Sequence, residues 1–130
     1  MRFNTSLLHA GTTKEIHGAT LPPIYQVSAF EQETSGNLEK IFENKAPGFC
    51  YTRVANQTVT AFENRITKLE GGIASVACAS GMAALTNAFL NILQSGDEIV
   101  SSAGLYGGSI DLFRDLETFG ITTKMDRWLL

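Results

Sequence analysis

The clearest periodic pattern in the chain begins after Asn56. Apolar residues recur there every three or four positions, at Val59, Phe62, Ile66 and Leu69. This spacing places them on one face of an α-helix. Asn56 is a residue type that caps helix N-termini, and Gly71-Gly72 is typical of a helix end. The pattern therefore predicts a helix from Asn56 to the glycine pair.

A short apolar run, residues 73–79, follows between Gly72 and Ser80. Runs of this length bounded by such residues are typical of buried strands, so we expect a strand here. Ser80 can cap a second helix, for which we expect one apolar face made of Met82, Leu85, Phe89, Ile92 and Leu93. Ser95-Gly96-Asp97 breaks that pattern, and a second strand is predicted over residues 98–102.

A third helix is predicted after the loop 103–108. Its inward face is expected to carry Leu112, Phe113, Leu116 and Phe119. A strand from residue 121 to about residue 125 follows. Helices that alternate with strands in this way predict an α/β domain with a largely parallel sheet and right-handed crossovers. Such a sheet needs both faces covered, so we expect apolar surface and strand edges open to further sequence.

Residues 1–56 differ from the rest because turn signals interrupt them throughout. Pro22-Pro23 forces extended backbone at Leu21, and glycine and proline pairs mark turns near residues 36 and 47. Only residues 37–43 indicate a helix. A long segment with little structure of its own usually wraps another surface or carries function. We interpret residues 1–56 as an extended arm and residues 57–130 as the beginning of an α/β domain.

Composition narrows the classes of protein that fit this pattern. The 130 residues are 44% hydrophobic and 18% charged, with a net charge of −3 and no basic stripe. These values suit a globular protein and disfavour nucleic acid or an anionic membrane as a partner. Two distant cysteines and the absence of a secretory leader pattern favour the cytoplasm. No spacing of histidines and cysteines indicates a metal site.

The turn from the expected strand 73–79 into the next helix is a candidate anion site. A helix N-terminus offers free N–H groups and the positive end of the helix dipole, and Gly81 has no side chain to block a phosphate. The alternative is that Ser80 is an ordinary N-cap and Gly81 a packing residue. From this motif alone the two interpretations remain open.

Two further motifs carry groups that suit a phosphorylated, planar ligand. Tyr51 and Arg53 combine a phenol with a guanidinium whose fork matches phosphate oxygens. Tyr106, before Gly107-Gly108, follows the second predicted strand, where ligands of open α/β folds bind. Each motif has a plain alternative, a surface Tyr and Arg in one case and a Tyr packed over a glycine turn in the other.

Taken in order, six motifs resemble the Cys/Met-metabolism PLP-dependent enzymes of fold type I. They are Pro23-Ile24-Tyr25-Gln26, Tyr51-Thr52-Arg53 with Asn56, Leu69-Glu70-Gly71-Gly72, Ala79-Ser80-Gly81-Met82-Ala83-Ala84, Gly96-Asp97-Glu98-Ile99-Val100 and Leu105-Tyr106-Gly107-Gly108. The resemblance spans residues from about 5 to 125. It implies the amino-terminal part of the large pyridoxal-phosphate-binding domain, in an aspartate aminotransferase-like architecture.

The resemblance also implies roles at matching positions. Ser80, Gly81 and Met82 would form the turn that holds the phosphate of pyridoxal 5′-phosphate, through the N–H groups of Gly81 and Met82. Tyr106 would stack on the pyridine ring and is the candidate catalytic residue, for proton transfer at the γ-leaving group. Tyr51 and Arg53 would reach the phosphate of a neighbouring subunit, which implies a homodimer that shares its active sites and, at full length, a tetramer.

Several of the family's catalytic residues have no counterpart in the sequence. The family carries its Schiff-base lysine, the aspartate at the pyridine nitrogen and the arginine for the substrate carboxylate further along a much longer chain. We expect surface positions for all five lysines, Lys14, Lys40, Lys45, Lys68 and Lys124. The chain is thus interpreted as a truncated part that is inactive alone. The family's pattern is also broken at Gln57, where the family usually has proline. It is broken again over residues 127–130, which do not continue the family's third strand.

The favoured activity is that of an O-acetylhomoserine sulfhydrylase, which makes homocysteine from an activated homoserine ester and sulfide. Gly108 supports this choice, because methionine γ-lyases tend to carry cysteine there. Cystathionine γ-synthase and the methionine or cystathionine γ-lyases are alternatives within the family. A non-catalytic fragment that binds phosphate or docks onto a subunit is the alternative of another class.

Overall fold

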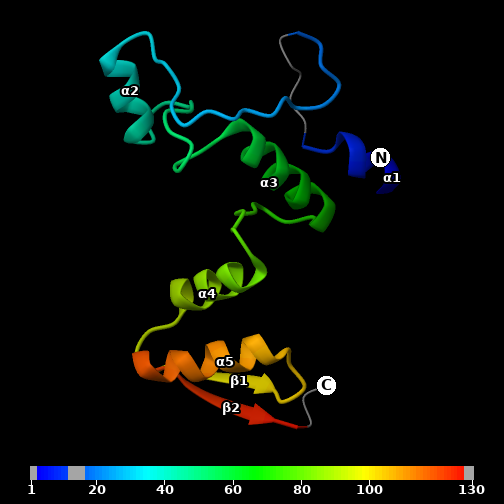
Figure 1. Ribbon diagram of the computed structural model, residues 1–130, viewed down its shortest axis with the longest axis vertical. Helices are drawn as coiled ribbons and strands as arrows, with labels where there is room; N and C mark the ends of the chain where they lie inside the picture. The colour runs from blue at the N-terminus through cyan, green and yellow to red at the C-terminus, as the bar shows by residue number, and fades with distance from the viewer. Residues whose placement is uncertain (1–2, 12–16, 128–130) are drawn as a thin grey trace. The chain divides into compact units, whose positions relative to one another are not determined.

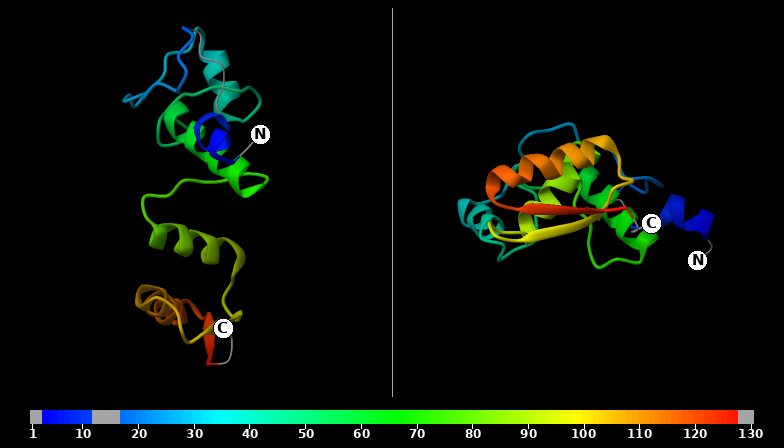
Figure 2. Two further views of the ribbon diagram at one scale, coloured as in Figure 1. Left: turned by 90° about the vertical axis from the view of Figure 1, so that its right-hand side faces the viewer. Right: turned by 90° about the horizontal axis from the view of Figure 1, so that it is seen from below.

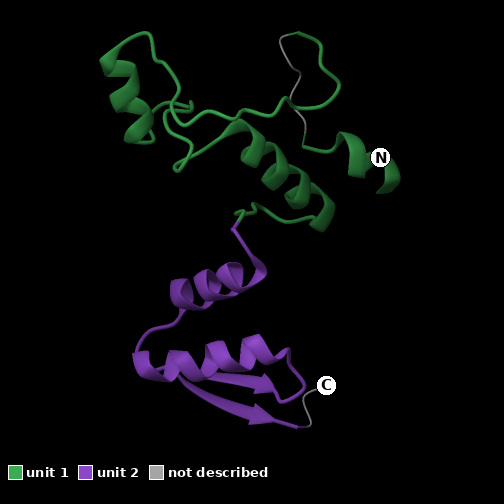
Figure 3. Cartoon of the chain, in the orientation of Figure 1, with its two compact units in different colours: residues 1–77 green, residues 78–130 purple. Residues whose placement is uncertain are grey.

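The computed structural model describes residues 3–11 and 17–127. The chain divides into two compact units, unit 1 of residues 1–77 and unit 2 of residues 78–130 (Figure 3). Lys14 and residues 128–130, which figure in the expectations above, lie outside the described residues. Each unit is a continuous stretch of sequence.

Unit 1 is built around the helix α3, Gln57–Glu70, which the periodic pattern predicted (Figure 1). Asn56 caps its N-terminus through a hydrogen bond from the Thr58 N–H, and Gly71 ends it in the left-handed conformation, with φ 65°. Both ends confirm the prediction, because capping and left-handed glycine are local preferences that short sequence motifs reveal.

The helix α1, Phe3–His9, packs against α3. Arg65 of α3 donates hydrogen bonds to the carbonyls of Leu8 and Ala10, at 3.1 and 3.4 Å. Gly11, with φ 70°, lets the chain pass close to α3. A Cβ added at Gly11 would lie 2.6 Å from the backbone nitrogen of Arg65. Sequence reasoning did not predict α1, since seven residues are too few for a clear periodic pattern.

The remainder of the arm contains the helix α2, Ser35–Phe42, which begins at the N-cap Thr34. It overlaps the predicted helix 37–43. Ile41 on this helix and Cys50 are buried, and the rings of Phe30 and Phe49 lie 5.8 Å apart between their centroids. The arm is therefore ordered by contacts among its own distant segments.

Residues 73–79 do not form a strand, so that prediction is wrong. Ala77 donates its N–H to the Glu63 carboxylate at 2.8 Å, and the hydroxyls of Thr67 and Ser75 are 2.9 Å apart. The segment is thus fastened to α3 by side chains and has no neighbouring strand. Ile73 and Val76 are exposed, at 103% and 83%. A run of apolar residues becomes a strand only where another strand can accept its backbone hydrogen bonds.

Unit 2 is a parallel β-α-β unit preceded by a helix. Its elements are α4, Gly81–Ile92; β1, Glu98–Ser102; α5, Gly107–Leu116; the 3-10 helix η1, Glu117–Phe119; and β2, Thr122–Asp126. The strands β1 and β2 are parallel, with Glu98 opposite Thr122 and Ser102 opposite Asp126. Figure 2 shows α5 along one face of this pair. The parallel α/β prediction is confirmed here.

The core of unit 2 lies between α5 and the two strands. It consists of Ile99, Phe113, Leu116 and Ile121, with Phe89, Leu93 and Leu112 packed against it. The rings of Phe89 and Phe113 meet edge to face, with centroids 5.0 Å apart. This contact joins the last turn of α4 to α5.

Three residues of the apolar faces predicted for the helices of unit 2 are exposed, Leu85 at 37%, Ile92 at 70% and Phe119 at 63%. Ile92 is the last residue of α4, and the packed Leu93 after it is an extended C-cap with φ −104° and ψ 148°, so the helical period no longer relates the two side chains. Phe119 lies in η1, whose tighter winding of about three residues per turn breaks the phase of the preceding α-helix. Among the described residues no helix is both long and apolar enough to cross a membrane.

Candidate functional site

The N-terminus of α4 begins at Ser80, an extended residue with φ −159° and ψ 165°. Its Oγ accepts the Ala83 N–H at 3.1 Å, and its carbonyl accepts the Ala84 N–H at 3.0 Å. Within residues 3–11 and 17–127, no acceptor is present for the N–H groups of Gly81 and Met82. The prediction that Ser80 caps this helix is confirmed, and the cap leaves two donors free in the first turn.

Gly81 keeps the space in front of these donors open. A Cβ built on Gly81 meets no atom within 4 Å. The residue is exposed, and no acidic side chain lies in the first turn of α4. Free N–H groups, the positive end of the helix dipole and open space are together the physical requirements for binding an anion.

Tyr106 lies in the same unit, as the residue before α5. Its carbonyl accepts the N–H groups of Ser109 and Ile110, at 2.9 and 3.3 Å, while its side chain takes no part in capping. The residue is 74% exposed. The hydroxyl and ring are therefore available to a ligand.

Gly108 brings the Tyr106 ring close to the first turn of α4. An added Cβ at this glycine would lie 2.6 Å from Cε1 of Tyr106 and 3.4 Å from Sδ of Met82. Both side chains therefore lie against the same glycine, and unit 2 gathers Ser80, Gly81, Met82 and Tyr106. A Tyr packed over this glycine turn was the alternative that the sequence left open, whereas the approach of Met82 to Gly108 was not predicted.

Tyr51 and Arg53 lie in unit 1 and contact each other. The Arg53 Cζ is 5.4 Å from the centroid of the Tyr51 ring, which is the geometry of a cation–π pair. Arg53 is exposed and Tyr51 is 40% exposed. Both side chains line two open hollows of about 470 and 350 Å³, one beside residues 25–28 and the other beside α2.

A short antiparallel pairing holds the turn that carries these two residues. Ala29 and Tyr51 form a β-bridge, Phe30 donates its N–H to the Cys50 carbonyl, and the Thr52 N–H reaches the Ser28 carbonyl at 2.9 Å. The backbone carbonyls of Val27 and Ser28, which are distant in sequence, accept the hydroxyl and N–H of Thr52 in this turn. These partners could not be predicted from the local motif.

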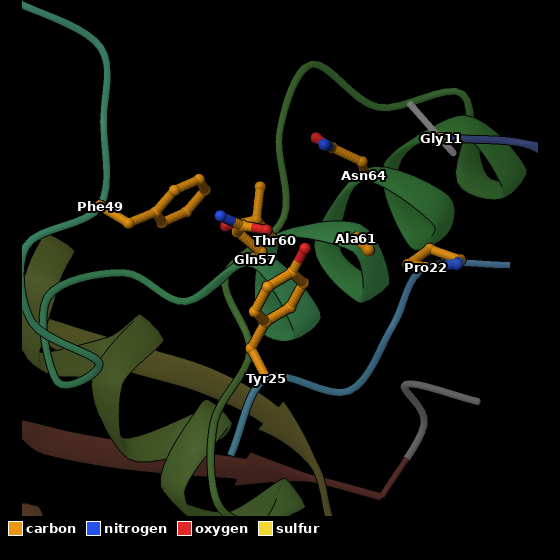
Figure 4. A pocket seen from close by; sticks show the side chains of 8 residues that line it. All are labelled: Gly11, Pro22, Tyr25, Phe49, Gln57, Thr60, Ala61 and Asn64. Carbon is orange, nitrogen blue, oxygen red and sulfur yellow. The ribbon is translucent and has the colours of Figure 1, made fainter. Parts of the chain in front are cut away.

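Another pocket of unit 1, of about 160 Å³, lies beside α3 and contains none of the predicted site residues. The rings of Tyr25 and Phe49 and the side chains of Gln57 and Thr60 line it (Figure 4). Gly11, Pro22, Ala61 and Asn64 complete the lining.

The described lysines have the surface positions that the sequence predicted. Lys40, Lys45, Lys68 and Lys124 are all exposed. Lys45 pairs with Glu43 at 2.7 Å and Lys124 with Glu98 at 2.8 Å. None of these four lysines adjoins the first turn of α4 in sequence, and two of them are occupied by carboxylates.

Proteins similar in sequence to this chain include a sulfhydrylase and a lyase. An O-acetyl-L-homoserine sulfhydrylase of Corynebacterium glutamicum is 45% identical over 112 residues, covering 85% of this chain and 26% of the relative. An L-methionine gamma-lyase of Fusobacterium nucleatum is 39% identical over 120 residues, covering 92% of this chain and 30% of the relative. The chain thus spans less than a third of the length of these two relatives.

A solved structure shows the same fold. The cystathionine gamma-lyase of Lactobacillus plantarum, complexed with L-serine, matches with a TM-score of 0.83 at 35% sequence identity. The match covers 97% of this chain and 31% of the lyase. Residues 4–127 also match the family described as Cys/Met metabolism PLP-dependent enzyme. The chain therefore belongs to the Cys/Met-metabolism family of PLP-dependent enzymes.

Proposed function

We propose that this chain binds the phosphate of pyridoxal 5′-phosphate at the N-terminus of α4. The observation that carries the proposal is the turn itself, in which Ser80 caps the helix and leaves the N–H groups of Gly81 and Met82 without acceptors. The space around Gly81 is open, as binding of an anion at this turn requires. Each N–H donated to an anionic oxygen forms a charge-assisted hydrogen bond, which is stronger than one between neutral groups.

Tyr106 is the residue proposed to contact the cofactor ring. Its exposed side chain lies beside Gly108 and Met82, so it can cover a planar group whose phosphate is held at α4. The bound cofactor supplies an electron sink for chemistry on an amino acid. The Tyr106 hydroxyl is proposed to hold or pass a proton near the γ-leaving group.

Tyr51 and Arg53 are proposed to serve the phosphate of a neighbouring subunit. An exposed guanidinium, stacked on a ring that limits its freedom, suits bidentate contact with phosphate oxygens. This assignment makes the protein a homo-oligomer, a dimer that shares its sites and a tetramer at full length.

The proposed reaction is γ-replacement, in which sulfide displaces the ester group of O-acetylhomoserine and yields homocysteine. The sulfhydrylase of C. glutamicum supports this choice. The lyases and cystathionine γ-synthase remain the alternatives, since lyases are similar as well. The rest of the machinery is proposed to come from sequence outside residues 1–130, and the isolated chain is proposed to be inactive. The free thiols Cys50 and Cys78 support a cytoplasmic location.

A charge change at the cap tests the phosphate site. Ser80→Asp keeps an N-cap and places a carboxylate at the turn, whereas Ser80→Asn provides a cap of almost the same shape without charge. Repulsion between unit charges about 4 Å apart is on the order of 4 kcal/mol near a protein surface. We expect Ser80→Asp to weaken binding of pyridoxal phosphate by more than tenfold, and Ser80→Asn to leave it within about threefold of the unmodified chain, because one factor of ten corresponds to only about 1.4 kcal/mol.

The measurement is an equilibrium titration of the chain with pyridoxal phosphate and, separately, with inorganic phosphate. Circular dichroism checks that both variants keep their helices. Equal affinity of the two variants for pyridoxal phosphate would show that its phosphate does not bind at the N-terminus of α4. Borohydride reduction followed by peptide mapping tests the inactivity of the chain, since specific labelling of one lysine together with turnover of O-acetylhomoserine would refute it.

A further inference from the structure

Asn56 is the one buried polar or charged residue among those the structure describes, with 3% of its surface exposed. Its Oδ1 accepts the Thr58 N–H at 2.8 Å and thereby caps α3. Its Nδ2 donates to the Tyr25 carbonyl at 3.1 Å and to Oγ1 of Thr52 at 3.0 Å. Both protons of the amide nitrogen are therefore used, and neither bond belongs to the cap.

The cap alone does not require asparagine. Serine and aspartate cap helices about as well, because each offers a side-chain oxygen to the first turn. Neither offers an N–H₂ group next to that oxygen. The two bonds donated by Asn56 reach a residue 31 positions earlier in the chain and another 4 positions earlier. They tie the arm and the Tyr51–Arg53 turn to the beginning of α3.

Thr52 connects Asn56 to the two proposed phosphate-binding residues, Tyr51 and Arg53. Its hydroxyl accepts from Asn56 and donates to the Val27 carbonyl, and its N–H donates to the Ser28 carbonyl. Thr52 stands between Tyr51 and Arg53 in sequence, so a fixed Thr52 fixes the backbone that carries both side chains. The cation–π contact at 5.4 Å depends on that backbone.

We propose that Asn56 is a positioning residue that holds Tyr51 and Arg53 in the arrangement described, through the hydroxyl of Thr52. The functional value of this role rests on the proposed function, in which that pair contacts a phosphate. The amide oxygen of Asn56 serves the helix, and the amide nitrogen serves the turn. A single buried side chain therefore couples α3 to the exposed arginine.

Replacing Asn56 by serine separates the two roles in the 130-residue chain. Asn56→Ser keeps a neutral cap oxygen and removes the two N–H donors of the amide. Asn56→Asp also removes these two donors, but its cap oxygen carries a negative charge. NMR measures the nuclear Overhauser contacts between the Arg53 side chain and the Tyr51 ring, together with the amide shifts of α3. We expect at least a twofold loss of intensity for those contacts in both variants while α3 remains helical. Persistence of the contacts in Asn56→Ser would overturn the proposal.

Thr52 provides a second test that leaves the cap of α3 untouched. Thr52→Val keeps the branched shape and removes the hydroxyl, whereas Thr52→Ser keeps the hydroxyl. We expect Thr52→Val to lose the Arg53–Tyr51 contacts and Thr52→Ser to retain them. Retention in Thr52→Val would contradict the proposal even if the Asn56 variants failed to fold.

Titration of the unmodified chain with inorganic phosphate keeps this inference separate from the proposed function. If the Arg53 resonances do not respond to phosphate, yet the contacts are lost in Asn56→Ser, the positioning role stands and the phosphate assignment fails. If the resonances respond and the contacts survive in both Asn56→Ser and Thr52→Val, the phosphate assignment stands and the positioning role fails.

Discussion

Gln57 occupies the first helical position of α3, where proline is well accommodated. Asn56 before it is extended, with φ −140° and ψ 138°, which is the conformation that a following proline imposes. In the described hydrogen bonds the Gln57 N–H is not a donor. We expect Gln57→Pro to raise the free energy of unfolding by about 0.4–1 kcal/mol, because proline restricts the unfolded chain.

Chemical denaturation of the chain measures this change. Gln57→Ala is the matched control, since it removes the same side chain from the pocket in Figure 4 without restricting the backbone. A proline variant less stable than the alanine variant would show that the first turn of α3 is not free to accept proline.

At the scale of single residues, the sequence predicted what depends on near neighbours. The caps at Asn56 and Ser80 were predicted because capping involves residues two or three positions away. The hydrogen bonds that the amide nitrogen of Asn56 donates were not predicted, because one acceptor, the Tyr25 carbonyl, is distant in sequence. The approach of Met82 to Gly108 likewise needed the folded structure, because the two residues are distant in sequence. The six predicted ligand residues themselves remain predictions.

Among the helices, α1 is bound at its C-terminal end by the Arg65 side chain of α3. Seven residues are too short for a stable isolated helix in water, and Arg65 donates to two carbonyls at the end of α1. We expect Arg65→Met to destabilise α1 locally by about 1–3 kcal/mol, the usual cost of losing hydrogen bonds from a charged donor. Hydrogen exchange of the α1 amides measures this loss.

Arg114→Met is the control for that experiment. The Arg114 guanidinium forms an ion pair with Asp111 at 3.1 Å in which both side chains are 70% exposed. Exposed pairs of this spacing contribute less than about 0.5 kcal/mol. If α1 exchanged equally fast in both variants, Arg65 would have no special role in holding it.

The elements that the sequence predicted well are those with a long periodic pattern or clear end signals. The helices α3 and α4 and the strands β1 and β2 belong to this group. Residues 73–79 failed because periodicity reports which residues are apolar and says nothing about whether a partner strand is available. The end of α5 shifted because a change to 3-10 winding at Glu117 has no apolar signature.

Across the whole chain, many large apolar side chains are exposed. The most exposed of them are Phe3, Ile24, Ile73, Val76 and Ile92, each with about two-thirds or more of its surface exposed. Extensive apolar exposure promotes association. We expect the 130-residue chain to sediment as larger species at higher concentration, and the double change Ile73→Ser with Val76→Ser to reduce that tendency.

Sedimentation velocity at several concentrations measures this association. Raising the salt concentration is the control, because salt screens charges and leaves apolar contacts intact. A chain that stays monomeric at all concentrations, or that dissociates in salt, would show that its apolar surface does not drive assembly.

At the scale of the whole chain, the sequence predicted the α/β class because helical and strand patterns alternate after Asn56, and six motifs in order indicated the fold type I family. Similarity to the cystathionine gamma-lyase of L. plantarum confirms that class. The internal order of residues 1–56 was beyond prediction. It depends on pairings such as Ala29 with Tyr51, which join residues more than twenty positions apart.

The division at Ala77 has a consequence for the order in which the chain is made. Ribosomes release the amino-terminal residues first, at about 5–20 residues per second, so unit 1 emerges several seconds before unit 2 is finished. The pairing of Ala29 with Tyr51 and the bonds of Asn56 lie wholly in unit 1 and can close in that interval. In the proposed homo-oligomer, arms on neighbouring ribosomes of one messenger RNA would then be available to each other before unit 2 is complete.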